Sequence, residues 1–187
     1  MKAIIHSILA LGLVAAALGI AAPPAGASDK QVARGKYLVS FNGCTDCHTP
    51  GHFLGKEEEE RYLAGSDVGF FVPGLGVFVG PNLTNDKETG LGNWTVKQIV
   101  TALQTGVCPD GRILAPVMPW HGFANMTKAD ATAVATYLKS LPPISHKVAG
   151  PFGPDEKVTS FVMTVLPADV FNNLPKPGAP PAPAPAK

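Results

Sequence analysis

Two segments of the chain repeat apolar residues at the spacing of an amphipathic helix. In the first, the positions i, i+3, i+4 and i+7 are occupied by Val96, Ile99, Val100 and Leu103. Thr95 and Gln98 have the spacing of a capping box in front of this stripe. Gly106 follows the stripe at a position that favours the end of a helix. The pattern therefore predicts a helix that starts at Thr95 and ends before Gly106.

The second stripe is the clearest in the chain. Its apolar positions are Ala131, Val134, Ala135 and Leu138. Thr127 followed by Asp130 predicts the start of this helix, and the pair Pro142-Pro143 predicts its end. Residues 29–41 form a third and less regular helical segment, with apolar positions at Val32, Tyr37, Leu38 and Phe41 and an N-cap at Ser28 or Asp29.

The region between the first and second predicted helices is long and rich in glycine and proline. Residues 51–93 show no convincing alternation of apolar and polar positions, so we expect a loop there. A loop of this length is unusual in a small domain unless it covers something other than a side-chain core. The apolar run at residues 158–166 is compatible with an extended segment. The pattern as a whole predicts an all-α fold.

The first 27 residues have the order of a secretory signal peptide. Lys2 is followed by an apolar run over residues 3–22 and then by the small-residue site Ala25-Gly26-Ala27. We therefore expect cleavage after Ala27 and a periplasmic protein. The apolar run is also long enough for an uncleaved membrane anchor, which is the alternative.

Composition narrows the class of partner. The chain has 15 Lys and Arg against 14 Asp and Glu, and loss of Lys2 with the leader would leave 14 against 14. A chain without a basic surplus is not expected to bind nucleic acid. The Pro/Ala-rich residues 173–187 predict a disordered tail. The remainder is divided into a domain at residues 28–150 and a C-terminal extension at residues 151–172.

The cysteines give the first indication of chemistry. The motif Cys44-x-x-Cys47-His48 fits a redox dithiol, half of a zinc site or a covalent haem attachment site. The third cysteine, Cys108, stands alone, no second pair of ligands has zinc spacing, and no βαβ pattern surrounds the motif. We therefore interpret Cys44 and Cys47 as the tethers of one haem c and His48 as an axial ligand of its iron. Cys108 is expected to be buried and inert, with an intermolecular disulfide as the alternative.

A second axial ligand has to come from a methionine or histidine elsewhere in the chain. Met118 is the strongest candidate, because Pro116 and Pro119 hold its loop extended and would pre-order the weakly ligating thioether. The remaining candidates are expected to be unligated; these are Met126, Met163, His52, His121 and His146, with His52 and His146 exposed. The acidic run at residues 57–60 is expected to be solvated, the alternative being that it steers a basic partner.

Several linked segments follow one another in a recognisable order. They are RGKYLVSFNGCTDCHTPG, then PNLTNDKETGLGNWT at residues 81–95, TGVCPDGR at 105–112, APVMPWHGF at 115–123 and TKADATAVATYLKSLPP at 127–143. Together they resemble the small class I type of c-type cytochrome, most closely the haem modules of bacterial dehydrogenase cytochrome subunits. The resemblance runs from about Val32 to Pro143. It implies about three to five helices around one covalent haem, joined by long Gly/Pro-rich loops.

The resemblance also implies roles for particular residues. Met118 lies in a Met-Pro loop that matches the one carrying the distal ligand of the family. The segment Gly80-Pro81-Asn82-Leu83 resembles the one whose proline carbonyl accepts a hydrogen bond from the axial histidine, so Pro81 would orient His48. A His/Met pair closes the iron to substrates and raises its potential. The expected protein therefore transfers electrons by an outer-sphere route and has no catalytic residue of its own.

The expected function is that of a periplasmic single-haem electron carrier. Its electron donor would be a periplasmic dehydrogenase, and its acceptor a downstream cytochrome or terminal oxidase of the respiratory chain. Association with a membrane would occur only through a partner or an uncleaved leader. Two alternatives remain open, a haem enzyme or gas-binding protein with an open distal site, and a fixed relay subunit of a dehydrogenase complex.

Overall fold

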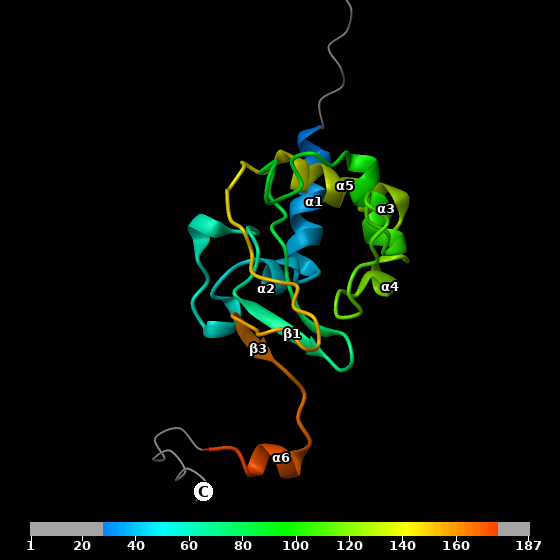
Figure 1. Ribbon diagram of the computed structural model, residues 1–187. Helices are drawn as coiled ribbons and strands as arrows, with labels where there is room; N and C mark the ends of the chain where they lie inside the picture. Colours follow the sequence, from blue (N-terminus) through cyan, green and yellow to red (C-terminus); the bar gives the residue numbers. More distant parts are fainter. Residues whose placement is uncertain (1–27, 176–187) are drawn as a thin grey trace, which may run out of the picture.

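Three long helices form one end of the molecule. The computed structural model describes residues 28–175, so the expected signal peptide and residues 176–187 of the expected tail lie outside it. The helices are α1 (Asp29–Phe41), α3 (Val96–Thr105) and α5 (Lys128–Ser140). Helix α1 packs across α5, and α3 packs on the other side of α5 (Figure 1). The three helices predicted from the apolar pattern are thereby confirmed.

The ends of these helices are set by the predicted capping residues. The side chains of Ser28, Thr95 and Thr127 each accept a hydrogen bond from the backbone N–H three residues further on. At Thr95 the capping box is complete, because the Gln98 side chain also accepts from the Thr95 N–H at 2.8 Å. Gly106 ends α3 in the left-handed region, with φ of 73°, where glycine carries no side-chain strain.

The crossing of α1 and α5 depends on Gly35. A Cβ at this position would collide with the carbonyl oxygen of Ala133 and lie 2.6 Å from the Cβ of Tyr137, so only glycine permits this approach. Beside the crossing, Arg34 and Asp130 form an ion pair with 2.9 Å between Nε and Oδ1. The core behind it consists of buried side chains from all three helices and one loop: Leu38, Val39, Leu63, Ile99, Val134, Ala135, Tyr137 and Leu138.

A small sheet lies at the other end of the molecule. Strands β1 (Val68–Val72) and β2 (Gly76–Val79) form an antiparallel hairpin, and β3 (Phe161–Met163) pairs in parallel with the other edge of β1. The expectation of a loop over residues 51–93 was therefore wrong for the hairpin. Its strands are only five and four residues long and are apolar on both faces, so they show no period-2 pattern. The sequence signal that could have predicted the turn of the hairpin is the dipeptide Pro73-Gly74, in which Gly74 has a φ of 78°.

The other helical elements are short. They are α2 (Cys44–His48), the 3-10 turns η1 (His52–Leu54) and η2 (Glu59–Arg61), α4 (Trp120–Phe123) and α6 (Ala168–Asn172). In Figure 1, α6 stands apart from the rest at the end of an extended segment. Within residues 28–175 no helix is long and apolar enough to cross a membrane.

The chain beyond residue 150 returns to the sheet. Phe152 is buried and exchanges two backbone hydrogen bonds of 2.9 Å with Val77, one residue into β2. The chain then supplies β3 nine residues later. The division of the chain at residue 150 stays a prediction. A truncation at residue 150 would remove the pairing of Phe152 with Val77 and would therefore test it.

Candidate functional site

The two cysteines of the Cys-x-x-Cys-His motif lie on the one-turn helix α2. Gly43, in the left-handed region at φ 64°, turns the chain from the end of α1 into α2. Cys44 and Cys47 are three residues apart and therefore share one face of the helix. Both are half-buried and carry free thiols. Burial and the nearby charge of Asp46 raise the pKa of Cys44 to about 11, so its thiol is protonated at neutral pH.

His48, at the end of α2, is buried and has its ring orientation fixed. Its Nδ1 lies 2.7 Å from the carbonyl oxygen of Pro81. A carbonyl only accepts, so Nδ1 carries the proton and the lone pair remains on Nε2. Burial lowers the pKa of His48, while the bond to Pro81 acts in the opposite direction. The ring is therefore neutral, oriented and able to donate from Nε2 to a metal.

The loop that carries Pro81 lies directly against α2. A Cβ on Gly80 would collide with the carbonyl oxygen of Cys47, so the close approach requires glycine. Neighbouring residues fix the loop through backbone bonds, from Ser66 N–H to the Gly80 carbonyl at 2.9 Å and from Leu83 N–H to the Leu63 carbonyl at 2.8 Å. The sequence analysis did not identify this close contact between Gly80 and α2. The signal that could have indicated it is the dipeptide Gly80-Pro81, because a glycine next to a proline is typical of a constrained backbone.

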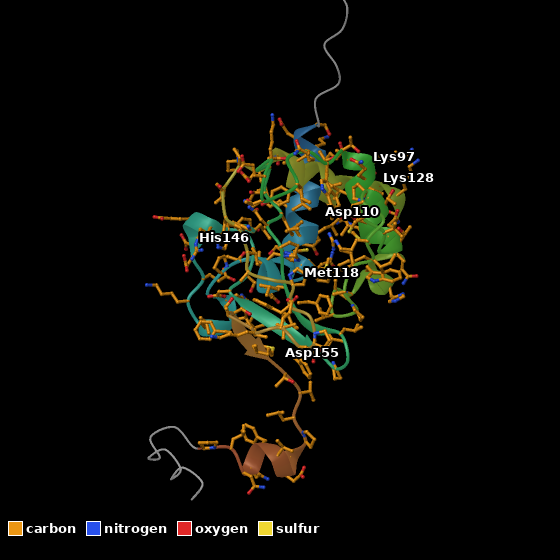
Figure 2. The ribbon with its side chains drawn as sticks, in the orientation of Figure 1. Lys97, Asp110, Met118, Lys128, His146 and Asp155 are labelled. Atoms are coloured by element: carbon orange, nitrogen blue, oxygen red, sulfur yellow. The ribbon has the colours of Figure 1, made fainter. Side chains whose placement is uncertain are left out.

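Met118 comes from a different part of the chain, the connection between α3 and α4. Figure 2 shows it toward the middle of the molecule, and it is half-buried. The loop is held by a bond from the Met118 N–H to the Ala115 carbonyl at 2.9 Å and one from the Trp120 N–H to the Met118 carbonyl at 2.8 Å. The structure thus brings Cys44, Cys47, His48 and Pro81 together, and ligation by Met118 stays a prediction.

The rival ligands lie in other surroundings. Met126 packs at the edge of the helical core, and Met163 lies on β3 with 40% of its surface exposed. His121 is exposed and stacks on Trp120, with 3.5 Å between ring centroids. These surroundings are compatible with packing or surface roles, and the expectation that the three residues are unligated stays a prediction.

Two histidines that were expected to be exposed are half-buried, so that expectation was wrong. His52 pairs with Glu57 through Nδ1 at 2.5 Å. His146 donates from Nδ1 to the Ala64 carbonyl at 2.7 Å and lies 2.9 Å through Nε2 from the Arg61 guanidinium. The partners of His146 are more than 80 residues away, so no local pattern could indicate them. Glu57 is five residues from His52, and the acidic run that contains it was interpreted only as a solvated face.

Two further features have the surroundings that the sequence indicated. Residues 57–60 are exposed, and Glu58 pairs with Arg61 at 2.6 Å. Cys108 is buried, with 3% of its surface exposed, and its thiol is free. Within residues 28–175 no group of three or more His, Cys, Asp or Glu side chains is placed to hold a metal ion.

The residues of α2 and its supporting loop fit a covalent haem. Two thiols on one face of a helix supply the tethers, and a neutral histidine with its Nδ1 proton engaged supplies a nitrogen ligand. A thioether on a proline-bounded loop, as at Met118, is a donor that haem iron accepts. The donor set is that of a haem site and differs from the carboxylate-rich sets of hard metal ions.

Comparisons with known proteins agree with this chemistry. Similar proteins include a fructose dehydrogenase cytochrome subunit of Gluconobacter japonicus, 35% identical over 112 residues, which are 58% of this chain and 22% of the relative. A quinone-type alcohol dehydrogenase cytochrome c subunit of Gluconacetobacter polyoxogenes is 37% identical over 127 residues, 65% of this chain and 26% of the relative. The chain thus spans about a quarter of the length of these two relatives.

A diheme cytochrome c-type protein of Cereibacter sphaeroides is 29% identical over 157 residues, which are 77% of this chain and 52% of the relative. The family model described as cytochrome c matches residues 32–142, more than half of the chain, and this range includes Cys44, Cys47, His48, Pro81 and Met118. The family implies covalent haem c, for which the attachment motif is present. The chain belongs to the cytochrome c family and is distantly related to cytochrome subunits of bacterial dehydrogenases.

Proposed function

We propose that this protein is a single-haem electron carrier that works in the periplasm between a dehydrogenase and the respiratory chain. The observation that carries the proposal is the geometry of His48. This residue follows the only Cys-x-x-Cys-His motif of the chain, and its Nδ1 proton is held by the Pro81 carbonyl. A histidine in this state is prepared to be a permanent iron ligand, as an electron carrier requires.

The residues of the chain then have distinct tasks. Cys44 and Cys47 would hold the haem covalently, and His48 would supply a nitrogen ligand to its iron. Met118 would supply a second ligand, which would keep water and substrates from the metal. The bound haem supplies a one-electron redox centre. An iron with both axial positions filled by protein exchanges electrons with a partner without binding a substrate.

The assignment of partner and location rests on the relatives and on the sequence. Several relatives are named as cytochrome subunits of dehydrogenases, which supports a dehydrogenase as electron donor. The acceptor would be a downstream cytochrome or a terminal oxidase. The leader-like residues 1–27 support export, with cleavage after Ala27. Sequencing the N-terminus of the purified holoprotein tests this, because it should begin at Ser28, whereas Met1 or Lys2 on membrane-bound protein would support the anchor.

Replacement of Met118 tests the closed site. The oxidised wild-type holoprotein should show the weak near-infrared sulfur-to-iron band and should not bind carbon monoxide readily when reduced. Met118→Ala should lose the band, bind carbon monoxide in the reduced state and have a lower potential, since a ligand that favours reduced iron is removed. The haem should stay attached, because Cys44, Cys47 and His48 are unchanged.

Met126→Ala and Met163→Ala are the matched controls and should keep the band. If the band survives in Met118→Ala and is lost in Met163→Ala, the ligand comes from the C-terminal segment and the assignment is wrong. A wild-type protein that lacks the band and binds carbon monoxide readily would instead be a haem enzyme or gas-binding protein. A mature chain that aggregates when purified without a partner would indicate a fixed subunit of a complex.

A further inference from the structure

The side chain of Asn82, next to Pro81, is buried and uses all of its hydrogen-bonding capacity. Only 2% of its surface is exposed. Its Nδ2 donates to Thr89 Oγ1 at 2.9 Å and to the Ile144 carbonyl at 2.8 Å. Its Oδ1 accepts from the N–H of Thr84 at 2.9 Å and from the Thr84 hydroxyl at 2.8 Å. An asparagine side chain has two N–H donors and commonly accepts two bonds, so Asn82 is fully satisfied and held rigidly.

This anchor acts on the group that orients His48. The Pro81 carbonyl belongs to the peptide that joins Pro81 to Asn82, and that peptide is planar. At the Pro81 end of this peptide the proline ring restricts the backbone. At the Asn82 end the Cα is held in place by the four hydrogen bonds of the Asn82 side chain. The direction of the Pro81 carbonyl, and with it the 2.7 Å bond to His48, therefore depends on Asn82.

The anchor is attached to a segment beyond the last long helix. Residues 144–146 are bound to the loop at several points, with the Ile144 N–H donating to Thr84 Oγ1 at 3.1 Å and the His146 N–H to Thr89 Oγ1 at 3.2 Å. The ring of His146, labelled in Figure 2, holds the same segment to the Ala64 carbonyl at 2.7 Å. The segment therefore gives Asn82 a fixed support.

We propose that Asn82 is a positioning residue for the axial histidine. By holding the Pro81 carbonyl against the Nδ1 proton, it sets how strongly His48 donates electrons through Nε2. A hydrogen bond to the distal ring N–H raises the basicity of a metal-bound histidine, and such bonds are one means by which a protein sets the potential of haem iron. The proposal rests on the assignment of His48 as iron ligand made above.

The test compares Asn82→Ala with Asn85→Ala in the reduced holoprotein. Asn85 lies in the same loop and also donates side-chain hydrogen bonds, but to carbonyls at the end of α5, those of Leu138, Lys139 and Leu141. Asn82→Ala removes the four side-chain bonds that hold the loop, so the bond from His48 Nδ1 to the Pro81 carbonyl should open more often. The His48 Nδ1 proton, followed by NMR, should then exchange with solvent about tenfold faster than in the wild type, a factor that corresponds to the net contribution of about one hydrogen bond. The potential should rise, because a less basic histidine stabilises oxidised iron less.

Asn85→Ala should lower the stability of the fold while leaving the Nδ1 exchange and the potential unchanged. Thr84→Val is a milder variant that keeps Asn82 and removes the Thr84 hydroxyl, which donates to Asn82 Oδ1 and accepts from the Ile144 N–H. Three of the four bonds of the Asn82 side chain remain, so both readouts should move in the same direction by a smaller amount. If Asn82→Ala does not fold, the two readouts of Thr84→Val test the proposal in its place.

The proposal is overturned if Asn82→Ala and Thr84→Val leave both readouts at their wild-type values, or if Asn85→Ala changes them equally. Failure of the proposed function can be distinguished from this outcome. It would appear in the wild-type protein itself, as a missing haem spectrum or as a His48 that does not bind iron.

Discussion

Asp130 binds two residues at the start of α5. Its backbone N–H donates to the Thr127 hydroxyl at 3.1 Å. Its carboxylate accepts from the Thr127 hydroxyl at 3.1 Å and from Arg34 Nε at 2.9 Å, although Arg34 is 96 residues away in α1. The hydrogen bond from Arg34, followed by that from Thr127, lowers the pKa of Asp130. An acidic residue in the first turn also favours the helix through its dipole. The ionised carboxylate therefore links α1 to α5.

Asp130→Asn should make the stability of the holoprotein less dependent on pH in the acid range. A carboxyl whose pKa is lowered by folding stabilises the fold above its unfolded pKa, near the ordinary value of 3.8, and this contribution is lost as the pH falls through the lower folded value. The variant should therefore be less stable than the wild type at pH 7 and equal to it at a pH below the folded pKa. Denaturant unfolding at both pH values measures the difference.

Asp110→Asn is the matched control, because within residues 28–175 the ion pair of Asp110 is with Arg112 in its own exposed loop, at 3.6 Å. It should leave the difference between the two pH values unchanged. An Asp130→Asn variant with the same loss of stability at both pH values would assign the effect to capping geometry and not to charge.

At the scale of elements, the long helices could be predicted from the sequence, whereas the hairpin of β1 and β2 could not. The third strand, β3, lies within the apolar run at residues 158–166 that was compatible with an extended segment. The three long helices follow from apolar spacing and capping residues, which are local signals. The attachment motif on α2 is equally local. The bond from His48 to Pro81 spans 33 residues, and only resemblance to a family pointed to it. The support given by Asn82 involves Ile144, 62 residues away, and no local pattern encodes such a contact.

Gly35→Ala should destabilise the protein although alanine is the better helix former. The added Cβ would be pressed against the Ala133 carbonyl and Tyr137, and overpacking of this kind costs about 1–3 kcal/mol, more than the roughly 1 kcal/mol gained in helix propensity. Thermal unfolding of the holoprotein checks this. Gly122→Ala, in α4, is the control, since a Cβ there meets nothing within 4 Å and should leave the stability equal or slightly higher.

At the scale of the whole molecule, the C-terminal part of the described chain divides into a packed and an exposed section. Phe152 is buried against the hairpin and β3 pairs with β1. From residue 161 to 175 every side chain is classed as exposed, including those of Val165, at 96%, and Phe171, at 66%. The backbone of β3 thus belongs to the sheet while its side chains and α6 project outward.

Two truncations should separate these sections. A chain ending at residue 150 should lose at least about 1.5–3 kcal/mol of stability from the burial of Phe152 alone. A chain ending at residue 163 keeps Phe152 and β3 and should unfold like the full-length protein. Denaturant unfolding of the three holoproteins gives the comparison. Equal stability of all three would place the end of the haem domain at residue 150, as the sequence suggested.

The crossing of α1 and α5 also orders the events by which the protein matures. Gly35, in α1, can pack against Ala133 only after α5 has been synthesised, and α5 lies nearly the whole domain later in the sequence. Until then α1 has no helix to pack against, and short helices are marginal in isolation. The Cys44–His48 motif, which follows α1 at once, therefore lacks the α1–α5 crossing beside it until residues 128–140 have been synthesised. We expect the two thiols to be most accessible for haem attachment before α5 packs on α1.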